Sequence, residues 1–545
     1  MTENRKLVRP PFDSDGNVVW TTEEKPMKKK ALQWWVWLIP AGLICVIVLG
    51  VFLYRSANRK TPEELCRDAL RDAFEEALGY REPMMKAMHT EDLAGYLKKT
   101  PTDVGLALQI QNTNLTLADF GFGERDEEGN IKDPDNSPKL LDYRGMGLAF
   151  ITTYDGDAVS LDTRFAVSAL SLSVAQLRYA DGELRFASPK IINEVISVPL
   201  KDVKDQWKDA PVWALLSEDT RKAAQNLGEA GFAYGAQGFA IAKNVRDAIV
   251  SSYPGGDSAW DRMVDAVSYE QLKDENGKEL TERVVVGSEK VPCYVFDLKV
   301  DEKTFYDIAE RIGTAIGGQG TAEAVRNAFR LTPDADGGNG VKVLAYVTKE
   351  GELAQLTAEV NGTVGEKQAH FSAKLRCMGT EDPQDKLFLT LNGDVGGEVY
   401  ELSAKKTVTA DRSRVSTDFD ISLRVPGMEQ VGLNGRATYN IGGGILKVYA
   451  NATVMGKTVA ALDLSAECTY KNSWDMRIND LTITNRTNDK FLTLYGQFSV
   501  SQSKSGVMEL TGDIVPLLTM TEEQAKAIVQ EATDQINWYI RQFFR

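Results

Sequence analysis

The strongest constraint on this chain is a run of uncharged, mostly apolar residues near its N-terminus. From Trp34 to Tyr54 the sequence reads WWVWLIPAGLICVIVLGVFLY, without one charged side chain. A helix of about 20 such residues matches a hydrocarbon core roughly 30 Å thick. Tryptophans gather at one end of the run, and Phe52 and Tyr54 stand at the other, as is typical of the two interfaces of a bilayer. We therefore predict one transmembrane helix over residues 32–55.

The residues on either side of this run indicate a signal anchor that is not cleaved. The run is too long for the apolar part of a signal peptide, and Arg55, Arg59 and Lys60 follow it in place of a small-residue cleavage motif. The basic residues before the run, Lys28 to Lys30 among them, slightly outweigh those after it, which favours a cytoplasmic tail. We predict a single-pass protein of the cell membrane with a cytoplasmic N-terminus and an extracytoplasmic C-terminal domain.

The bulk of the chain is acidic and has ample material for a core. It has 545 residues, of which 43% are apolar and 26% charged, so at least two folded units are expected beyond the anchor. Residues 1–31 hold seven basic and five acidic side chains, a charge of +2, which leaves −15 − 2 = −17 for the remainder. Such a charge repels nucleic acid and anionic lipid headgroups, so we expect no nucleic acid among the partners. The predicted anchor makes the membrane itself a partner.

Periodicity predicts a helix and then a first group of strands after the anchor. Thr61 and Glu64 form a capping-box pair at the start of a juxtamembrane helix. From about 104 to 198 apolar residues recur with period two, and Asp155-Gly156 and Asp181-Gly182 are hairpin signals between such runs. The polar, turn-rich stretch 124–139 is predicted to be an exposed loop.

The second half of the chain has a helical part, a long series of strands and a last helix. Helical patterns cover 200–209, 217–252, 301–317 and 321–330, and roughly ten short strands follow between Val341 and Thr511. Thr521 and Gln524 form another capping box. The apolar stripe behind it predicts a helix docked on the sheet, and its members are Ala525, Ile528, Val529, Ala532, Ile536, Tyr539, Ile540 and Phe543.

Together these patterns predict an α+β fold class. One N-terminal transmembrane helix precedes a large antiparallel β-sheet, which is a curved sheet, half-barrel or sandwich with a helical insert and a docked C-terminal helix. The predicted domains are a cytoplasmic tail (1–31), the transmembrane helix (32–55), a juxtamembrane helix with a first β-meander (56–199), the helical insert (200–340), and a long antiparallel β-meander with a C-terminal helix (341–545).

Residues that carry chemistry are sparse. The sequence has only two histidines, His89 and His370, which excludes a histidine-rich metal site. No catalytic residue, metal ligand or cofactor is predicted. The cysteines outside the anchor are far apart and form no CxxC pair: Cys66, Cys293, Cys377 and Cys468. Isolated buried thiols are the favoured interpretation, and disulfides in any of three pairings remain open.

Two short motifs are better explained by turns than by ligand binding. Met455-Gly456-Lys457-Thr458 has the end of a phosphate-loop pattern, but Asn451 stands where that loop requires its first glycine, so we predict a hairpin turn. Asp334-Ala335-Asp336-Gly337 resembles the opening of a calcium loop. Ala345, however, replaces the closing glutamate, so a connection between the insert and the sheet is favoured.

One uncharged segment in the insert is a candidate pocket lining. Residues 230–242 read AGFAYGAQGFAIA, too short to cross a bilayer, with glycines on neighbouring turns of the expected helix. A helix packed tightly against the sheet explains this composition. The alternative is a helix that lines an apolar pocket between sheet and insert, and the lining residues would be Phe232, Tyr234, Phe239 and Ile241.

The layout of the chain carries a resemblance. An anchored chain with a long antiparallel meander and strand-to-helix passages such as YVFDLKVDEK, residues 294–303, resembles uncharacterised single-pass envelope proteins of Gram-positive bacteria. In outline it is also similar to the LolA/LppX lipid-carrier scaffold. That resemblance implies a curved sheet that wraps an apolar ligand against helices, and it assigns no site residue.

Three functional hypotheses follow. The leading one is a membrane-anchored, extracytoplasmic envelope protein that is not an enzyme and binds a lipid-like ligand or another envelope component. The second is a purely structural or protein-interaction module. The third is a carboxylate-based hydrolase, which requires a deep cleft with two carboxyl groups of raised pKa.

Overall fold

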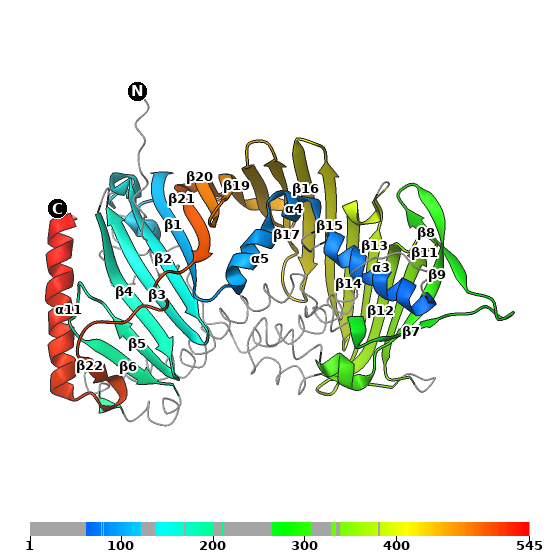
Figure 1. The fold of residues 1–545 in the computed structure, drawn as a ribbon, viewed down its shortest axis with the longest axis horizontal. Coiled ribbons are helices and arrows are strands. Elements are labelled where there is room, and N and C mark those ends of the chain that lie inside the picture. The colour runs from blue at the N-terminus through cyan, green and yellow to red at the C-terminus, as the bar shows by residue number, and fades with distance from the viewer. Residues whose placement is uncertain are drawn as a thin grey trace.

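The computed structural model describes residues 61–120, 137–200, 264–307, 329–333 and 338–543, with positions 210 and 211, and leaves out positions 78, 80, 168, 169, 380 and 381 within these ranges. Figure 1 shows these residues as one long sheet that arches across the molecule, with β1–β6 towards one end and β7–β9 at the other. The sheet contains 22 strands.

The strands are β1 (Thr102–Thr113), β2 (Met146–Asp155), β3 (Ala158–Val167), β4 (Leu170–Ala180), β5 (Glu183–Ala187), β6 (Val195–Pro199), β7 (Ser268–Gln271), β8 (Thr281–Val286), β9 (Glu289–Lys299), β10 (Phe329–Leu331), β11 (Val341–Thr348), β12 (Leu353–Val364), β13 (Lys367–Cys377), β14 (Lys386–Val395), β15 (Glu398–Ala410), β16 (Arg414–Arg424), β17 (Val431–Asn440), β18 (Ile445–Val454), β19 (Lys457–Tyr470), β20 (Trp474–Asn485), β21 (Lys490–Gln502) and β22 (Ile514–Pro516). The helices are α3 (Pro62–Ala77), α4 (Pro83–Ala87), α5 (Thr90–Lys98) and α11 (Glu522–Phe543), with short 3-10 helices η1 (Leu117–Phe120), η3 (Leu140–Tyr143), η6 (Pro383–Asp385) and η7 (Leu517–Thr519).

Two meanders join to make the sheet. β1 to β6 form one series of antiparallel neighbours, and β11 to β21 form another. The seam between them is the antiparallel pair of β1 and β21, in which Thr102 lies opposite Gln502 (Figure 1). β9 extends the far end beside β11, and β22 pairs in parallel with β6.

The predicted fold class, α+β with an N-terminal transmembrane helix, is wrong. Strands make up 56% of the described structure, which is a large mixed sheet with few helices. Within the described ranges, no helix combines the length and the apolar character that crossing a bilayer requires. The predicted span, residues 32–55, and most of the predicted insert lie outside those ranges. At Phe329 and Arg330, where a helix was predicted, the chain forms β10 and pairs with β12.

Three short helices lie along one side of the sheet. The Thr61 hydroxyl accepts a hydrogen bond from the Glu64 amide at 3.2 Å, and the Glu64 carboxylate accepts one from the Thr61 amide at 2.8 Å, so the predicted capping box is confirmed at the start of α3. α3 then buries small and aliphatic side chains against strands β9 to β14, namely Cys66, Ala69, Leu70, Ala73 and Ala77. α4 packs Met84 against β15 to β19.

The period-two pattern gives the sheet two unlike sides. We call the side that bears α3, α4 and α5 the apolar face and the opposite side the polar face. On the apolar face between β9 and β14, side chains such as Phe296, Leu356 and Phe371 are at most 1% exposed and form the main core. The predicted hairpins at Asp155-Gly156 and Asp181-Gly182 are confirmed, since each connects two paired strands.

The last helix departs from its prediction. α11 begins at the predicted capping box, where the Gln524 amide donates to the Thr521 hydroxyl at 3.2 Å. Ala525 is buried, but Val529 and Ile536 are 56% and 44% exposed. The predicted docking of this helix on the sheet is therefore wrong in part: among the described members of its apolar stripe, Ile528, Ala532 and Tyr539 are half-buried, and only Val529 and Ile536 are exposed.

Candidate functional site

A long uncharged surface crosses the middle of the sheet on the apolar face. Between β16 and β21, and on through β1 to β4, the register places no Asp, Glu, Lys or Arg at the interior positions of this face in the described strands. Neighbouring strands lie about 4.8 Å apart, so ten strands extend over roughly 45 Å. We call this stretch the open sector of the apolar face.

Large apolar side chains in the open sector are incompletely covered. Leu433 of β17 is 42% exposed, and many others are half-buried. The half-buried members are Phe419, Ile421, Leu423, Val431, Val448, Val454, Leu462, Leu464, Leu481, Ile483, Leu492, Leu494, Phe498, Leu106, Leu108, Ile110, Leu148, Phe150, Leu161, Phe165 and Leu177. A continuous apolar surface of this extent is typical of a site that binds a protein, a membrane or an apolar ligand.

The polar face of the same strands has the opposite composition. Charged side chains follow one another across it, and Arg436 of β17 forms a two-pronged ion pair with Asp418 of β16, at 2.6 Å and 2.9 Å. A shallow groove of about 700 Å³ lies on this side, lined by Arg436, Thr438, Lys447, Val448, Tyr449, Asp463, Leu464, Ser465 and Asp480. The uncharged character of the open sector therefore belongs to one face and is not a property of these strands as a whole.

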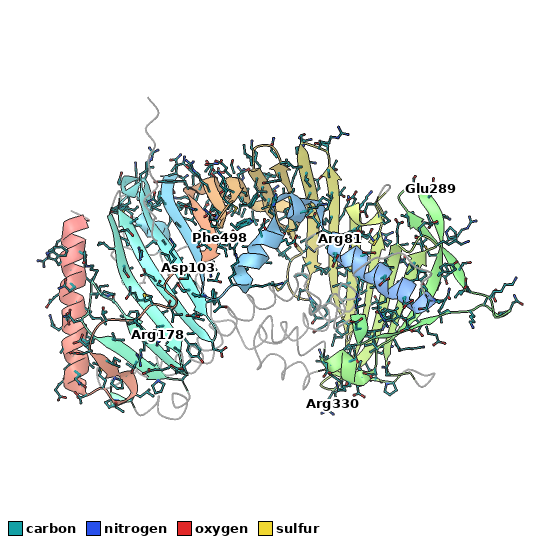
Figure 2. The ribbon with its side chains drawn as sticks, viewed as in Figure 1. Arg81, Asp103, Arg178, Glu289, Arg330 and Phe498 are labelled. Carbon is teal, nitrogen blue, oxygen red and sulfur yellow. The ribbon has the colours of Figure 1, made fainter. Side chains whose placement is uncertain are left out.

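The strands β1 to β4 invert the usual relation between side-chain size and burial. On the polar face Ala107 and Ala149 are 8% and 3% exposed. The segment after β21 crosses that face, since the Met508 amide donates to the Ser160 hydroxyl at 3.1 Å and Arg178 pairs with Glu509 at 3.0 Å (Figure 2). The larger leucine and phenylalanine side chains stand on the other face and are only half-buried.

Helices α4 and α5 cover one border of the open sector. The Trp474 indole donates to the Met88 carbonyl at 3.0 Å, and the ring of His89 stacks on that of Tyr470 with centroids 4.6 Å apart. The Tyr470 hydroxyl lies 2.7 Å from that of Tyr439, which satisfies both groups inside the apolar surroundings. Trp474 also meets Phe498 edge to face, and Figure 2 shows Phe498 next to α5. The uncovered part of the face thus has an aromatic margin.

A second candidate site lies where α3 meets η6. The Arg81 guanidinium donates to three carboxylates of α3, Asp72 at 2.8 Å, Glu75 at 2.9 Å and Glu76 at 2.6 Å (Figure 2). Burial, and next the negative charge of Asp382, raise the pKa of Glu76 to about 7, against the lowering effect of Arg81. A carboxyl group that titrates near neutral pH is one of the two that the hydrolase hypothesis required.

The size of this second site does not fit catalysis on a substrate. Its cavity measures about 110 Å³ and is lined by Ala69, Asp72, Glu76, Gly351, Glu352, Asp382 and Gln384. Sites for small molecules usually measure about 300 to 1,000 Å³. Because Arg81 also occupies three of the carboxylates, we assign this cluster to the attachment of α3 and do not propose a hydrolase.

The sequence-predicted site residues fall outside the described ranges. Phe232, Tyr234, Phe239 and Ile241, predicted to line an apolar pocket, all lie between positions 212 and 263, so that prediction stays untested. The four cysteines are buried free thiols, as favoured. Met455 and Gly456 form the β18–β19 turn with positive φ, so the predicted hairpin is confirmed there. In the part of the chain that is described, no three metal-ligating side chains come together.

Sequence reasoning missed the open sector, although the signal for it was present. The alternation in β16 to β21 places every charged interior residue on one side, and the same is true of β1 to β4. What the pattern could not indicate is whether another layer covers the uncharged side. Comparison with known proteins adds nothing to this assignment, because no family model, curated protein or solved structure matches the chain.

Proposed function

We propose that this chain is a non-enzymatic, membrane-attached protein of the cell envelope whose extracytoplasmic sheet binds a lipid-like ligand on the open sector. The observation that carries the proposal is an uncharged apolar surface across ten neighbouring strands, with large side chains left half-buried. Membrane attachment rests on the uncharged run Trp34 to Tyr54 in the sequence.

The dimensions of the open sector favour a ligand with long hydrocarbon chains. A bilayer core of roughly 30 Å holds two acyl chains end to end, so one chain measures about 15 Å. The sector, at roughly 45 Å, exceeds that length in the direction across the strands. Each methylene group that moves from water to such a surface contributes about 0.8 kcal/mol, so a single acyl chain supplies ample binding energy even after ordering costs.

Lipid retention by the purified protein tests the proposal. The full chain is extracted in a mild detergent, washed, and examined by native mass spectrometry and by analysis of the organic extract. We expect co-purified lipid, and we expect Leu433→Glu to reduce it, because a carboxylate in an apolar contact loses hydration without gaining a partner. The loss should be at least about tenfold, since the unpaired group costs more than about 1.4 kcal/mol.

Ile445→Glu is the matched control. Ile445 is 39% exposed and Leu433 is 42% exposed, and they lie on the paired strands β18 and β17 but on opposite faces. The control should retain lipid at the level of the unmodified protein. The proposal is refuted if the unmodified protein and the Ile445→Glu variant are both purified without lipid. It is also refuted if Leu433→Glu and Ile445→Glu reduce the amount of bound lipid equally.

A further inference from the structure

Four cations gather on the polar face of strands β13 to β15, which lie side by side in Figure 1. Lys374 and Arg376 belong to β13, Lys386 to β14 and Lys405 to β15. The register sets Phe388 of β14 directly opposite Arg376 on one side and Lys405 on the other. Lys374 and Lys386 each stand two positions before one of these residues on its own strand, so all share one face. We call the four cations the basic cluster.

Within the described ranges, no member of the basic cluster forms an ion pair. Other cations of the same face, such as Arg424 of β16, do form one, in this case with Glu401 at 3.6 Å. Asp420 of β16 stands directly opposite Lys405, yet these two described residues do not pair. The cluster is therefore a local excess of positive charge on an acidic protein.

The stability of the fold alone gives no reason for this arrangement. Like charges on neighbouring strands repel one another and destabilise a sheet. Carboxylates that could neutralise them are plentiful, because the chain has 78 acidic and 63 basic side chains. Departures of this kind from a consistent design are expected where a protein has a function to serve. An anionic ligand explains the basic cluster better than the fold does.

The aromatic ring in the middle of the cluster orients the arginine. The guanidinium carbon of Arg376 lies 4.7 Å from the centroid of the Phe388 ring. A guanidinium held on a ring in this way keeps its planar fork of N–H groups ready to donate two hydrogen bonds to one phosphate. Since the ring is half-buried and carries Arg376, it offers little surface on which a nucleobase could stack. Recognition at this site therefore depends on charge.

The spacing of the cations favours a ligand with several linked charges. Neighbouring members on one strand are about 7 Å apart, and Arg376 and Lys405 are separated by two strand spacings, about 10 Å. A single small anion contacts only part of such a group, whereas a chain of anionic groups contacts all of it.

The surroundings of the cluster favour a narrow chain over a membrane surface. Exposed carboxylates lie on the same face at its border, namely Asp394, Glu401 and Asp420. A flat surface of anionic headgroups would meet these carboxylates together with the cations and would be repelled by them. A polymer can cross the cations alone.

We propose that the basic cluster is a binding site for a linear polyanion of linked phosphate groups, which crosses the polar face over β13 to β15. The inference does not depend on the proposed lipid binding, which uses the opposite face. Each cation that meets a phosphate releases counterions from the polymer. Four contacts on a flexible chain therefore predict that the logarithm of the association constant falls with the logarithm of the salt concentration with a slope of about −3.

Fluorescence anisotropy of end-labelled polyphosphate, titrated with the full chain in a nonionic detergent, tests the proposal. At about 0.1 M salt, Lys374→Gln and Lys405→Gln should each weaken binding about fivefold and make the slope shallower by about 0.7, because each removes one phosphate contact. The double variant should weaken binding about 25-fold. Both lysines are exposed, so the fold should be retained, which far-ultraviolet circular dichroism verifies.

Lys447→Gln is the matched control. Lys447 is exposed on the polar face of β18, and its cross-strand neighbours are Thr438 and Ser465, so it is an isolated cation. The variant changes the net charge by the same amount as the other two and should bind polyphosphate as the unmodified chain does.

Four outcomes overturn the proposal. The first is that the unmodified chain does not bind polyphosphate at low salt, and the second is that Lys447→Gln weakens binding as much as Lys374→Gln. The third is that inorganic phosphate displaces the polymer at an equal concentration of phosphate groups, which would indicate a site for a single anion. The fourth is displacement by mixed micelles of the detergent and an anionic phospholipid at that same concentration, which would indicate a membrane surface.

Discussion

Two sectors of one sheet share the same alternation but differ in what covers it. From β9 to β14 the apolar face packs against α3, and Phe371 is 1% exposed. From β16 through β21 and on to β4 the same face continues without charge, yet Leu433 is 42% exposed and its neighbours are half-buried. Among the described residues, the first sector is the main core, and the second has the composition of a core but is covered only in part, where α4 packs on it.

One type of contact, a phenylalanine opposite a glycine, occurs in both sectors and allows a direct comparison. Phe371 lies opposite Gly393 in the first sector, and Phe419 lies opposite Gly435 in the second. A Cβ atom at either glycine would come within 2.7 Å of the facing ring, so each glycine lets a phenylalanine lie across the neighbouring strand, and at Gly435 the Cβ would also meet the Tyr449 carbonyl oxygen at 2.1 Å. The two sites differ in their third layer, since Phe371 also meets Phe329 at 5.9 Å.

The largest expected effect comes from truncating these two rings in turn. Phe371→Ala should lower the free energy of unfolding by about 3 to 5 kcal/mol, because it leaves a cavity in a closed core. Phe419→Ala should lower it by only about 1 to 2 kcal/mol, because its half-buried ring gives up less contact. Urea unfolding of the lipid-free protein measures both. Equal losses would mean that the open sector is part of the core.

A substitution at the border between the two sectors should have the next largest effect on the free energy of unfolding. Lys406 of β15 projects onto the apolar face, donates to the Ala77 carbonyl at the end of α3, and pairs with Glu82 at 2.9 Å. Glu82 is 3% exposed and caps α4. Lys406→Met should cost about 3 kcal/mol of unfolding free energy, because it leaves a buried carboxylate without its cation.

Two further variants separate charge from packing at this border. Lys405 neighbours Lys406 in the chain but is exposed on the polar face, so Lys405→Met should leave the unfolding free energy nearly unchanged. The double variant Lys406→Met with Glu82→Gln should recover much of the loss. If it does not, Lys406 stabilises the border by its length and contacts and not by its charge.

The smallest effect concerns the pH dependence of the covered sector. Because the pKa of Glu76 lies near 7 in the folded protein and near 4.5 in the unfolded chain, the folded state keeps a proton that the unfolded state has released. Stability from this group is therefore full at low pH and falls as the pH rises through 7. Since Glu76 is partly exposed, we expect a change of about 1 to 2 kcal/mol in the free energy of unfolding.

Thermal unfolding at a series of pH values measures this dependence. Glu76→Gln should flatten it, since glutamine does not titrate. Asp382→Asn should shift it to lower pH, because the charge of Asp382 is one of the causes that raise the pKa of Glu76. A dependence that is unchanged in both variants would assign it to another group.

The local features of the fold were predictable from the sequence, because they depend on neighbours in the chain. The capping boxes at Thr61 and Thr521 and the turns at Asp155, Asp181 and Met455 all appear where their residues predict them. The run of short strands after Val341 also follows from period two, which is a local signal.

The features that could not be predicted from the sequence depend on residues far apart in the chain. The alternation in β16 to β21 is the same whether a third layer covers the apolar face or leaves it open, so the pattern could not distinguish core from ligand surface. The stripe of α11 likewise predicts that something covers it, but not that the sheet does. The two meanders join in one sheet through the pairing of β1 with β21, which neither strand's composition reveals.

The pairing of β1 with β21 also constrains the order in which the sheet can form during synthesis of the chain. β1 is among the earliest parts of the sheet to leave the ribosome, and its partner is the last long strand to do so. Until β21 has been synthesised and Gln502 can pair opposite Thr102, β1 is an unpaired edge strand, and such an edge can pair with strands of other chains. Assembly of this sheet therefore waits for nearly the whole chain, which predicts slow maturation and a need for protection on the way.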